Sequence, residues 1–465
     1  MWHLEPGDGA PLYKRIIRHL EAAVASGHLA PGERLPSERD LARLLSVNRS
    51  TVIRALDEMG DRGILVRKRG SGTYVNREKW GVQSYARLNW QDPPALLPAA
   101  KAGPFHREAA FLRQRAARSG EKLRDLSRDE LAPGLLPVFP IPERSWRDVV
   151  RAEQGDEAAH LGLPQLRHSL SAFLRATSGI DAPAEDILIT SGSRQAIFLI
   201  TQCLLKVGDA VGVEAPSYFY SLPVFQAAGL RLYALPMDEH GITLEGLEKL
   251  ASRRSLKMVF VNPVFHNPTG TVMSDARKNA VLDFCAAARI PIVEDDAYSL
   301  LFFRRMEGLS PLKAWDRRNQ VIHIGSLSSY AGRNLRAGWL LAPTGIIAKL
   351  AAARQMMDAG LSVLPQIIAN EYLDNVATRH LSVLRGNLAA SALELAAFLR
   401  GTFGDRIVFD PPSGGLYTYA VMRDRDARSY AAMQTAFLRH GVIPALGEDF
   451  GDARPSFRLN HSLFS

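Results

Sequence analysis

Cysteine is scarce in this sequence, which contains two cysteines among 465 residues. Cys203 and Cys285 both lie in apolar stretches, so we interpret them as reduced residues of the core and not as a disulfide. Long apolar runs are missing too. No run reaches the roughly 18 residues that predict a membrane helix, and the N-terminus lacks the basic-then-apolar pattern of a signal peptide. We therefore expect a cytosolic protein, and we expect no metal site.

Acidic residues are the minority among the charged ones, with 48 Asp and Glu against 57 Lys and Arg and a net charge of +9. This balance is compatible with binding to nucleic acid, although many basic proteins bind none. Residues 1–76 hold 12 basic and 9 acidic side chains, whereas residues 77–120 hold 8 and 3. The more basic segment is either a solvated tether or a second contact with DNA.

The first 76 residues have the pattern of a helix-turn-helix with a hairpin. Residues 11–25 repeat apolar side chains at helical spacing. Ser37, followed by Asp40, resembles a capping box that begins a helix ending near Leu44. A tight turn follows, and a second helix is expected from Asn48 to about Met59. Residues 63–75 alternate like two strands with glycines at their turn, which predicts a wing.

Residues 35–39 read LPSER and residues 70–75 read GSGTYV, and with these motifs residues 11–76 closely resemble the winged helix of the GntR family. The alternative is a basic interaction domain that does not bind DNA. The resemblance implies that the DNA contacts are Arg39, Asn48, Arg49 and Thr51, with the wing backbone at Ser71 and Gly72. Arg49 has the geometry to bind a guanine edge, and Asn48 either reads an adenine or caps its own helix. Arg67 and Lys68 are expected to meet phosphates.

Residues 77–122 are interpreted as a basic, proline-containing linker. Its first part, around residues 92–98, reads as extended chain. Its second part, residues 105–119, has the spacing of a helix, because Ala109, Leu112 and Ala116 share one side.

Residues 123–465 alternate strand and helix signals. Continuous apolar strands at 187–190, 210–213, 258–261, 291–293 and 321–324 are separated by helical segments. Such strands predict a buried, mostly parallel sheet with flanking helices, and a smaller α+β part is expected near the C-terminus.

Loop motifs follow these strands in one order: TSGSRQA at 190–196, EAPSY at 214–218, NPVFHNPTG at 262–270, VEDDAY at 293–298 and FRLN at 457–460. The set resembles the fold-type I aminotransferases, which depend on pyridoxal phosphate. The resemblance implies that Asp295 pairs with the pyridine nitrogen, that Asn267 and Tyr298 bind the ring oxygen and that Tyr218 stacks on the ring. It assigns the phosphate to Ser193, the backbone of Arg194, Ser326, Ser328 and Arg336. Arg458 would bind the carboxylate of an amino-acid ligand.

One family residue is absent. In residues 325–339, Ser326, Ser328 and Arg336 match the family pattern, but Ser329 stands where the cofactor-bonding lysine should be. A serine hydroxyl cannot replace the amine that bonds to the cofactor's aldehyde. Residues 330–334 also depart from the family sequence. We therefore expect no catalytic residue and no aminotransferase activity.

The whole chain resembles the MocR/GabR subfamily of GntR regulators, in which a winged helix, a linker and an aminotransferase-like domain follow one another. The resemblance implies a head-to-tail homodimer and a DNA-binding regulator that responds to an amino compound. We interpret the chain as such a regulator, which binds pyridoxal phosphate, pyridoxamine phosphate or an amino-acid adduct without a covalent bond, or another anion. Two alternatives stay open: a large domain that serves only as a dimerisation scaffold, and an active aminotransferase, against which Ser329 argues.

Overall fold

The computed structural model describes residues 10–25, 28–29, 32–68, 70–76, 103–120, 123–139, 147, 160–358 and 360–464. The chain divides into two compact units, Met1–Ala99 and Ala100–Ser465. The part of the expected linker at residues 77–102 lies outside the described residues.

The first unit is the expected winged helix. Its elements are α1 (Leu12–Ala25), α2 (Glu38–Leu44), α3 (Arg49–Asp61), β1 (Leu65–Lys68) and β2 (Gly72–Val75). The strands β1 and β2 pair antiparallel, with Lys68 opposite Gly72 at the tip of the wing. Ile16 and Leu20 of α1 are buried against Val52 and Met59 of α3, so the apolar faces read from the sequence form one small core.

The start of α2 has the predicted cap. The backbone N–H of Asp40 donates to Ser37 Oγ at 3.2 Å, and Ser37 Oγ donates to a carboxylate oxygen of Asp40 at 2.6 Å. The first bond satisfies a backbone donor that the helix itself leaves free.

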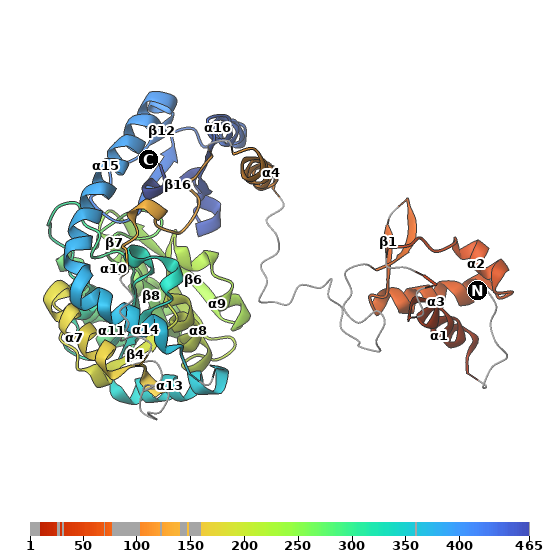
Figure 1. Cartoon of the computed structure of the whole chain (residues 1–465), viewed down its shortest axis with the longest axis horizontal. Coiled ribbons are helices and arrows are strands. Elements are labelled where there is room, and N and C mark those ends of the chain that lie inside the picture. Colours follow the sequence, from red (N-terminus) through yellow and green to blue (C-terminus); the bar gives the residue numbers. More distant parts are fainter. Residues whose placement is uncertain are drawn as a thin grey trace. The chain divides into compact units, whose positions relative to one another are not determined.

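The large unit is built on an eight-stranded sheet in the order β4-β11-β10-β9-β8-β5-β6-β7 (Figure 1). The strands are β4 (Ile187–Thr190), β5 (Ala210–Ala215), β6 (Arg231–Asp238), β7 (Gly241–Ile242), β8 (Leu256–Val261), β9 (Ile292–Asp296), β10 (Val321–Ser326) and β11 (Gly338–Leu341). Pairing is parallel from β10 through β6, whereas β11 runs antiparallel to both of its neighbours. The expected mostly parallel sheet is confirmed.

Helices cover both faces of this sheet because its strands are apolar on both sides. On β8, Phe260 faces a core shared with α8 (Ser193–Cys203) and α13 (Thr344–Asp358). The next residue, Val261, faces a second core shared with α11 (Asp275–Ala288). On that second face the β4 edge of the sheet is covered by α7 (Pro164–Ser178).

A smaller antiparallel sheet lies at the C-terminal end, in the order β12-β13-β16-β15. Its strands are β12 (Ile407–Val408), β13 (Tyr417–Met422), β15 (Ala445–Leu446) and β16 (Ser456–Asn460). The long helix α15 (Ala377–Phe403) joins the two parts, because its Leu384 is buried in the core of the large sheet and its Leu399 in the core of the small one. A short strand, β3 (Arg124–Asp125), pairs with β14 (Val442–Ile443) beside this sheet.

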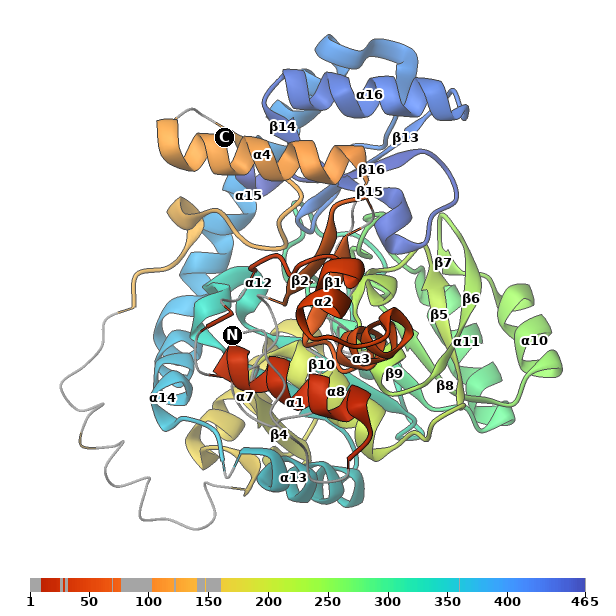
Figure 2. The same ribbon diagram turned by 90° about the vertical axis from the view of Figure 1, so that its right-hand side faces the viewer.

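The helix expected at residues 105–119 is present as α4 (Pro104–Ser119). It packs beside α16 (Ala427–Arg439) in both views (Figure 1, Figure 2). Phe105 and Ala109 are buried there, and Arg113 donates from Nε to Asp125 at 2.8 Å. This part of the expected linker is therefore a packed element of the large unit.

Two expectations about composition can be compared with the structure. Cys285 is buried as predicted, but Cys203 is exposed, because it is the last residue of α8 and its side chain leaves the core at the helix end. Among the described residues, no helix has the length and apolarity needed to cross a membrane.

A substitution at Gly338 on β11 tests how closely the backbone packs at this end of the sheet. A Cβ there would lie 2.7 Å from Gly192 Cα and 2.9 Å from Gly325 O, both of which are backbone atoms. We expect Gly338→Ala to cost about 1–3 kcal/mol of stability, because backbone cannot move aside as a side chain can. The midpoint of urea unfolding, followed by circular dichroism of the full chain, measures the loss.

Gly345→Ala is the matched control, since Gly345 lies in α13 and a Cβ there meets nothing within 4 Å. We expect this variant to unfold at the same urea concentration as the wild type or slightly above it, because alanine favours a helix. Equal midpoints for both variants would contradict the packing argument.

Candidate functional site

The predicted DNA contacts gather on one face of the winged helix. Glu38 at the start of α2 pairs with Arg49 of α3 at 3.1 Å and with Arg67 of β1 at 3.3 Å. One acidic side chain thus connects the first turn of the recognition helix to the wing. Arg67 also pairs with Asp57, at 2.6 Å. DNA phosphates or bases would have to replace these carboxylates, which is inexpensive because all four side chains are partly exposed.

The remaining DNA candidates also reach solvent. Arg39 and Asn48 are exposed, and Thr51 is half-buried beside them. Asn48 has the backbone conformation of a helix cap, but its side chain makes no capping hydrogen bond. Its side-chain amide is therefore available for the other expected role, which is to read a base.

The wing tip is shaped by local contacts. The Lys68 ammonium lies 5.0 Å from the centre of the Tyr74 ring, and the Ser71 and Tyr74 hydroxyls are 2.6 Å apart. Gly72 has φ +120°, a conformation that side chains disfavour, and a Cβ there would lie 2.9 Å from Arg34 Nε. The backbone at Ser71 and Gly72 is thereby presented at the end of the hairpin.

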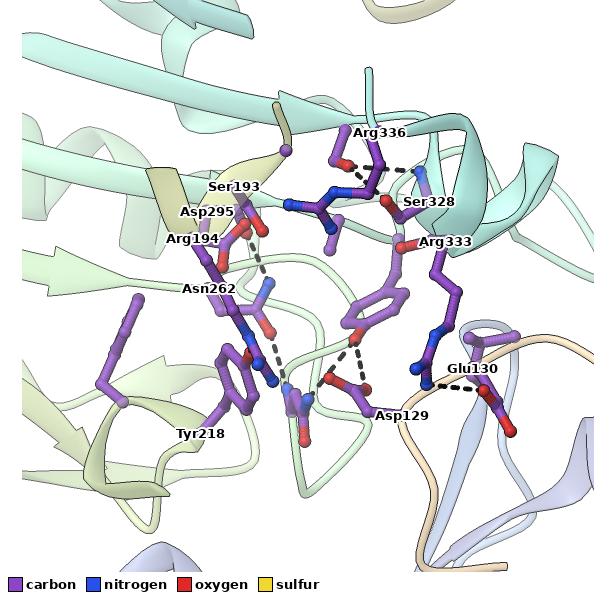
Figure 3. A pocket seen from close by; sticks show the side chains of 18 residues that line it. Asp129, Glu130, Ser193, Arg194, Tyr218, Asn262, Asp295, Ser328, Arg333 and Arg336 are labelled. Carbon is purple, nitrogen blue, oxygen red and sulfur yellow. Dashed lines mark hydrogen bonds and ion pairs between the residues drawn. The ribbon is translucent and has the colours of Figure 1, made fainter. Parts of the chain in front are cut away.

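In the large unit, a cavity of about 230 Å³ opens at the carboxyl ends of the parallel strands (Figure 3). All nine residues that the family resemblance assigned to the cofactor line it: Ser193, Arg194, Tyr218, Asn267, Asp295, Tyr298, Ser326, Ser328 and Arg336. They come from segments up to 143 positions apart, as Ser193 and Arg336 show. The motifs that follow one another along the sequence therefore meet at one end of the sheet.

One end of the cavity fits a phosphate. Helix α8 begins at Ser193. The Arg336 guanidinium lies beside this helix start: if the preceding residue, Gly192, carried a Cβ, that atom would be 3.4 Å from the guanidinium. Ser328 N–H donates to Ser326 Oγ at 3.2 Å, which holds these two hydroxyls together at the end of β10. Among the described residues, no carboxylate pairs with Arg336. A helix N-terminus, hydroxyls and an uncompensated guanidinium are the groups that bind phosphate.

The other end fits the ring of pyridoxal phosphate. Asp295 is buried on β9, and its Oδ1 has no hydrogen-bond partner within the described part of the chain. Burial, with the nearby charges of Asp296 and Asp129, raises the pKa of Asp295 to about 7. A protonated ring nitrogen would supply both the missing donor and the missing positive charge. The residues present therefore fit this cofactor at its phosphate and at its ring nitrogen.

Hydrogen bonds hold the ring-binding side chains in place. Asn267 Nδ2 donates to the Tyr298 hydroxyl at 3.4 Å, and Arg194 Nε donates to the Tyr218 hydroxyl at 3.3 Å. Burial raises the pKa of both tyrosines, so they stay neutral. Asn262, which had no assigned role, donates from Nδ2 to the backbone carbonyl of Asp295 at 2.6 Å and so positions the aspartate.

Ser329 lines the same cavity, in the short helix α12 (Ser328–Ala331). Among the described residues that line the cavity there is no lysine.

Three charged residues of the cavity were missed by sequence reasoning: Asp129, Glu130 and Arg333. Arg333 pairs with Glu130 at 2.7 Å, and Glu130 also pairs with Arg128 at 3.0 Å. Figure 3 shows Asp129 and Glu130 entering from a segment outside every quoted motif. The available signal was weak: three successive charges at 128–130 end a charged stretch directly before the uncharged residues 131–139.

Arg458 lies behind the cavity and lines a neighbouring one that shares Asp129, Arg194 and Tyr218 with it. It is buried on β16, where Nη1 donates to Asn267 Oδ1 at 2.9 Å and Nη2 to the Ser127 carbonyl at 2.8 Å. Its expected role with a ligand carboxylate stays a prediction.

Comparison with protein families matches both units. Residues 159–461 match the aminotransferase class I and II family, and residues 12–75 match the bacterial regulatory proteins of the gntR family.

Similar whole proteins are regulators. The HTH-type transcriptional regulator YdfD of Bacillus subtilis is 31% identical over 98% of this chain and 93% of its own length. YisV of the same organism is 32% identical over 100% and 95%, and NorG of Staphylococcus aureus is 26% identical over 93% and 96%.

Similar solved structures are aminotransferases. The kynurenine aminotransferase of Pyrococcus horikoshii has a TM-score of 0.65 and 26% identity, covering 76% of this chain and 89% of that one. An archaeal alanine:glyoxylate aminotransferase has a TM-score of 0.67 and 25% identity, covering 78% and 91%.

We predict that Arg49 reads a base. Replacing Arg49 with alanine should cost about 1–3 kcal/mol of binding to a preferred sequence and relax the base preference at one position, because a bidentate base contact is lost. Gel shifts on duplexes selected from a random pool measure both effects. Unchanged affinity for the selected duplex would contradict the recognition-helix assignment.

Lys68→Ala provides the contrast at the wing. A lysine that meets only phosphate should weaken binding evenly across sequences and flatten the dependence of affinity on salt. A sequence-dependent loss for this variant would show instead that the wing reads bases.

Proposed function

This chain belongs to the GntR family of bacterial transcriptional regulators, in the MocR type that carries an aminotransferase-like domain, and we propose that this domain senses a small phosphorylated ligand without bonding to it covalently. The candidate ligands are pyridoxal phosphate, pyridoxamine phosphate and an adduct of pyridoxal phosphate with an amino acid. Ligand binding would change how the winged helix holds DNA. The match to the GntR family and the regulator relatives imply that DNA is the target of this unit.

One observation carries this proposal: the cavity keeps its phosphate-binding and ring-binding groups although Ser329 replaces the lysine. Asp295 has a buried oxygen without a hydrogen-bond partner, which is costly when the cavity is empty of ligand. Arg336 is exposed to the cavity and has no partner carboxylate, so it is available to an anion. A ligand with a protonated ring nitrogen and a phosphate would offset the first cost and bind the second group. The Pyrococcus aminotransferase of similar fold was solved in complex with PMP.

The same site argues against catalysis by transamination. Pyridoxal phosphate, when bound, supplies an aldehyde that reacts with amines and a ring that accepts electrons. Transamination also needs a basic group that moves a proton at the reacting carbon, which the family lysine provides. At position 329 this chain offers a neutral hydroxyl, so its residues can bind and orient a ligand but lack that base.

The homodimer implied by the family resemblance stays part of this proposal. Apolar side chains that a second copy could cover are present, since Val138 and Met356 are 88% and 90% exposed.

We predict that Arg336 is the main cation for the ligand phosphate. Arg336→Gln should weaken binding of pyridoxal phosphate by about 1.5–3 kcal/mol, the range for a hydrogen bond to a charged group. Arg333→Gln is the matched control, because Arg333 lines the same cavity but already pairs with Glu130. Calorimetry should show a much smaller loss for the control. Absence of binding to the wild type would favour the scaffold alternative.

We predict that the bound cofactor stays free of covalent attachment. After incubation with pyridoxal phosphate and borohydride, the peptide containing residues 325–339 should carry no phosphopyridoxyl group, because a serine offers no amine. Mass spectrometry of the digested protein checks this. A modified residue in that peptide would overturn the proposal of non-covalent binding, whereas a modified surface lysine elsewhere would leave it intact.

A further inference from the structure

Arg458 is a buried cation that has a carboxylate of its own chain at the limit of ion-pair distance, while its Nε has no hydrogen-bond partner within the described part of the chain. Its side chain is 4% exposed, and its guanidinium lies 4.2 Å from the centre of the Tyr417 ring and 4.7 Å from that of Phe450. Among the described residues, the one carboxylate within ion-pair distance is Asp129, at 3.9 Å. A buried guanidinium without such a partner would be costly.

Asp129 is fixed in this position by several neighbours. The Tyr417 hydroxyl donates to Asp129 Oδ1, and the Tyr298 hydroxyl donates to the same oxygen at 3.5 Å. Asn460 Nδ2 donates to the carbonyls on either side of it, those of Arg128 at 3.0 Å and Glu130 at 2.6 Å. The backbone around Asp129 is thus tied to β16, the strand that carries Arg458.

The second oxygen of Asp129 is open to a ligand. No residue in the described part of the chain bonds to Asp129 Oδ2, and Asp129 lines both the ring-binding cavity and its neighbour. In Figure 3 the Asp129 carboxylate lies on the opposite side of the cavity from Arg336. A molecule that extends from the phosphate end toward Arg458 therefore meets a carboxylate first.

Charged side chains of both signs line the cavity, and they differ in what already pairs with them. Arg336 supplies an uncompensated cation at the phosphate end, whereas Glu130 and Arg333 neutralise each other at 2.7 Å. At the far end Asp129 and Asp295 are both acidic, and Asp129 is close enough to raise the pKa of Asp295. Arg194 is the remaining cation there, and its guanidinium bonds to the Tyr218 hydroxyl. A second anion on the ligand would face Asp129, and a cation would be attracted to it.

From this geometry we infer that Asp129 is an internal carboxylate that occupies Arg458 and selects the ligand: the site takes a phosphorylated amine without a carboxylate in preference to an amino-acid adduct. The inference rests on the proposed function and narrows its ligand class. Pyridoxamine phosphate and phosphopyridoxyl conjugates of simple amines belong to the preferred class, because each carries a phosphate at one end and a protonated amine at the other.

Two conjugates that differ by one carboxylate test this preference: N-(5'-phosphopyridoxyl)-ethylamine and N-(5'-phosphopyridoxyl)-alanine. Calorimetry with the full-length wild type should show at least about tenfold tighter binding of the ethylamine conjugate, since the alanine conjugate places like charge against Asp129. The wild-type measurement by itself decides whether the site prefers the conjugate without a carboxylate.

Asp129→Asn then tests the residue. It removes the charge but keeps the shape, so Arg458 becomes available and the preference should disappear or reverse toward the alanine conjugate. Adding Arg458→Gln to Asp129→Asn should remove that gain. Glu130→Gln is the matched control: it changes the charge of the cavity wall equally but leaves the Asp129–Arg458 pair intact, so the wild-type ratio of the two affinities should persist.

The outcomes separate this inference from the proposed function. Equal or tighter binding of the alanine conjugate by the wild type would overturn the inference while supporting a phosphate-binding sensor. A preference for the ethylamine conjugate that survives Asp129→Asn would overturn the role of Asp129. Binding of neither conjugate, with no binding of pyridoxal phosphate, would overturn the proposed function and the inference with it.

Discussion

The functional end of the large unit depends on a close approach of backbone that glycine alone permits. Gly338 of β11 lies so near Gly192 and Gly325 that a methyl group would overlap backbone atoms of both. This contact brings the N-terminus of α8 next to the end of β10 and to Arg336, which follows shortly after. The phosphate corner is thus built by the packing of the sheet, and its groups are in place before any ligand arrives.

A frame of this kind is independent of the residue at position 329, because backbone packing and not that side chain holds the sheet end together. The lysine of the family forms a bond with the ligand, but it does not hold the sheet or the helix termini together. Under the proposed function, Ser329 offers the ligand no amine, while binding groups such as Asp295 and Arg336 line the cavity. Such an arrangement of charges and hydroxyls would distinguish ligands without transforming them, which suits a regulator.

Both units hold key arginines with carboxylates of their own chain. In the winged helix, Glu38 pairs with Arg49 at the partly exposed surface, where exchange for DNA costs little. In the large unit, Asp129 lies 3.9 Å from Arg458, whose side chain is 4% exposed, whereas that of Arg49 is 64% exposed. The inferred restrictive role of the second pair therefore depends on the burial of its arginine and not on that of its carboxylate.

Much of this protein follows from its sequence alone. Apolar periodicity placed α1 and α3, alternation placed the wing, continuous apolar runs placed the strands, and loop motifs identified nine residues that meet in one cavity, because each of these signals is local in the chain. The tertiary structure alone decided that α4 packs into the large unit, that Cys203 is exposed and that Asp129 faces Arg458. The last pair joins positions 329 residues apart along the chain, so no local pattern contains it. Such contacts depend on how residues 126–130 lie against β16, where Asn460 bonds to the carbonyls of Leu126, Arg128 and Glu130, and packing determines this after the local elements have formed.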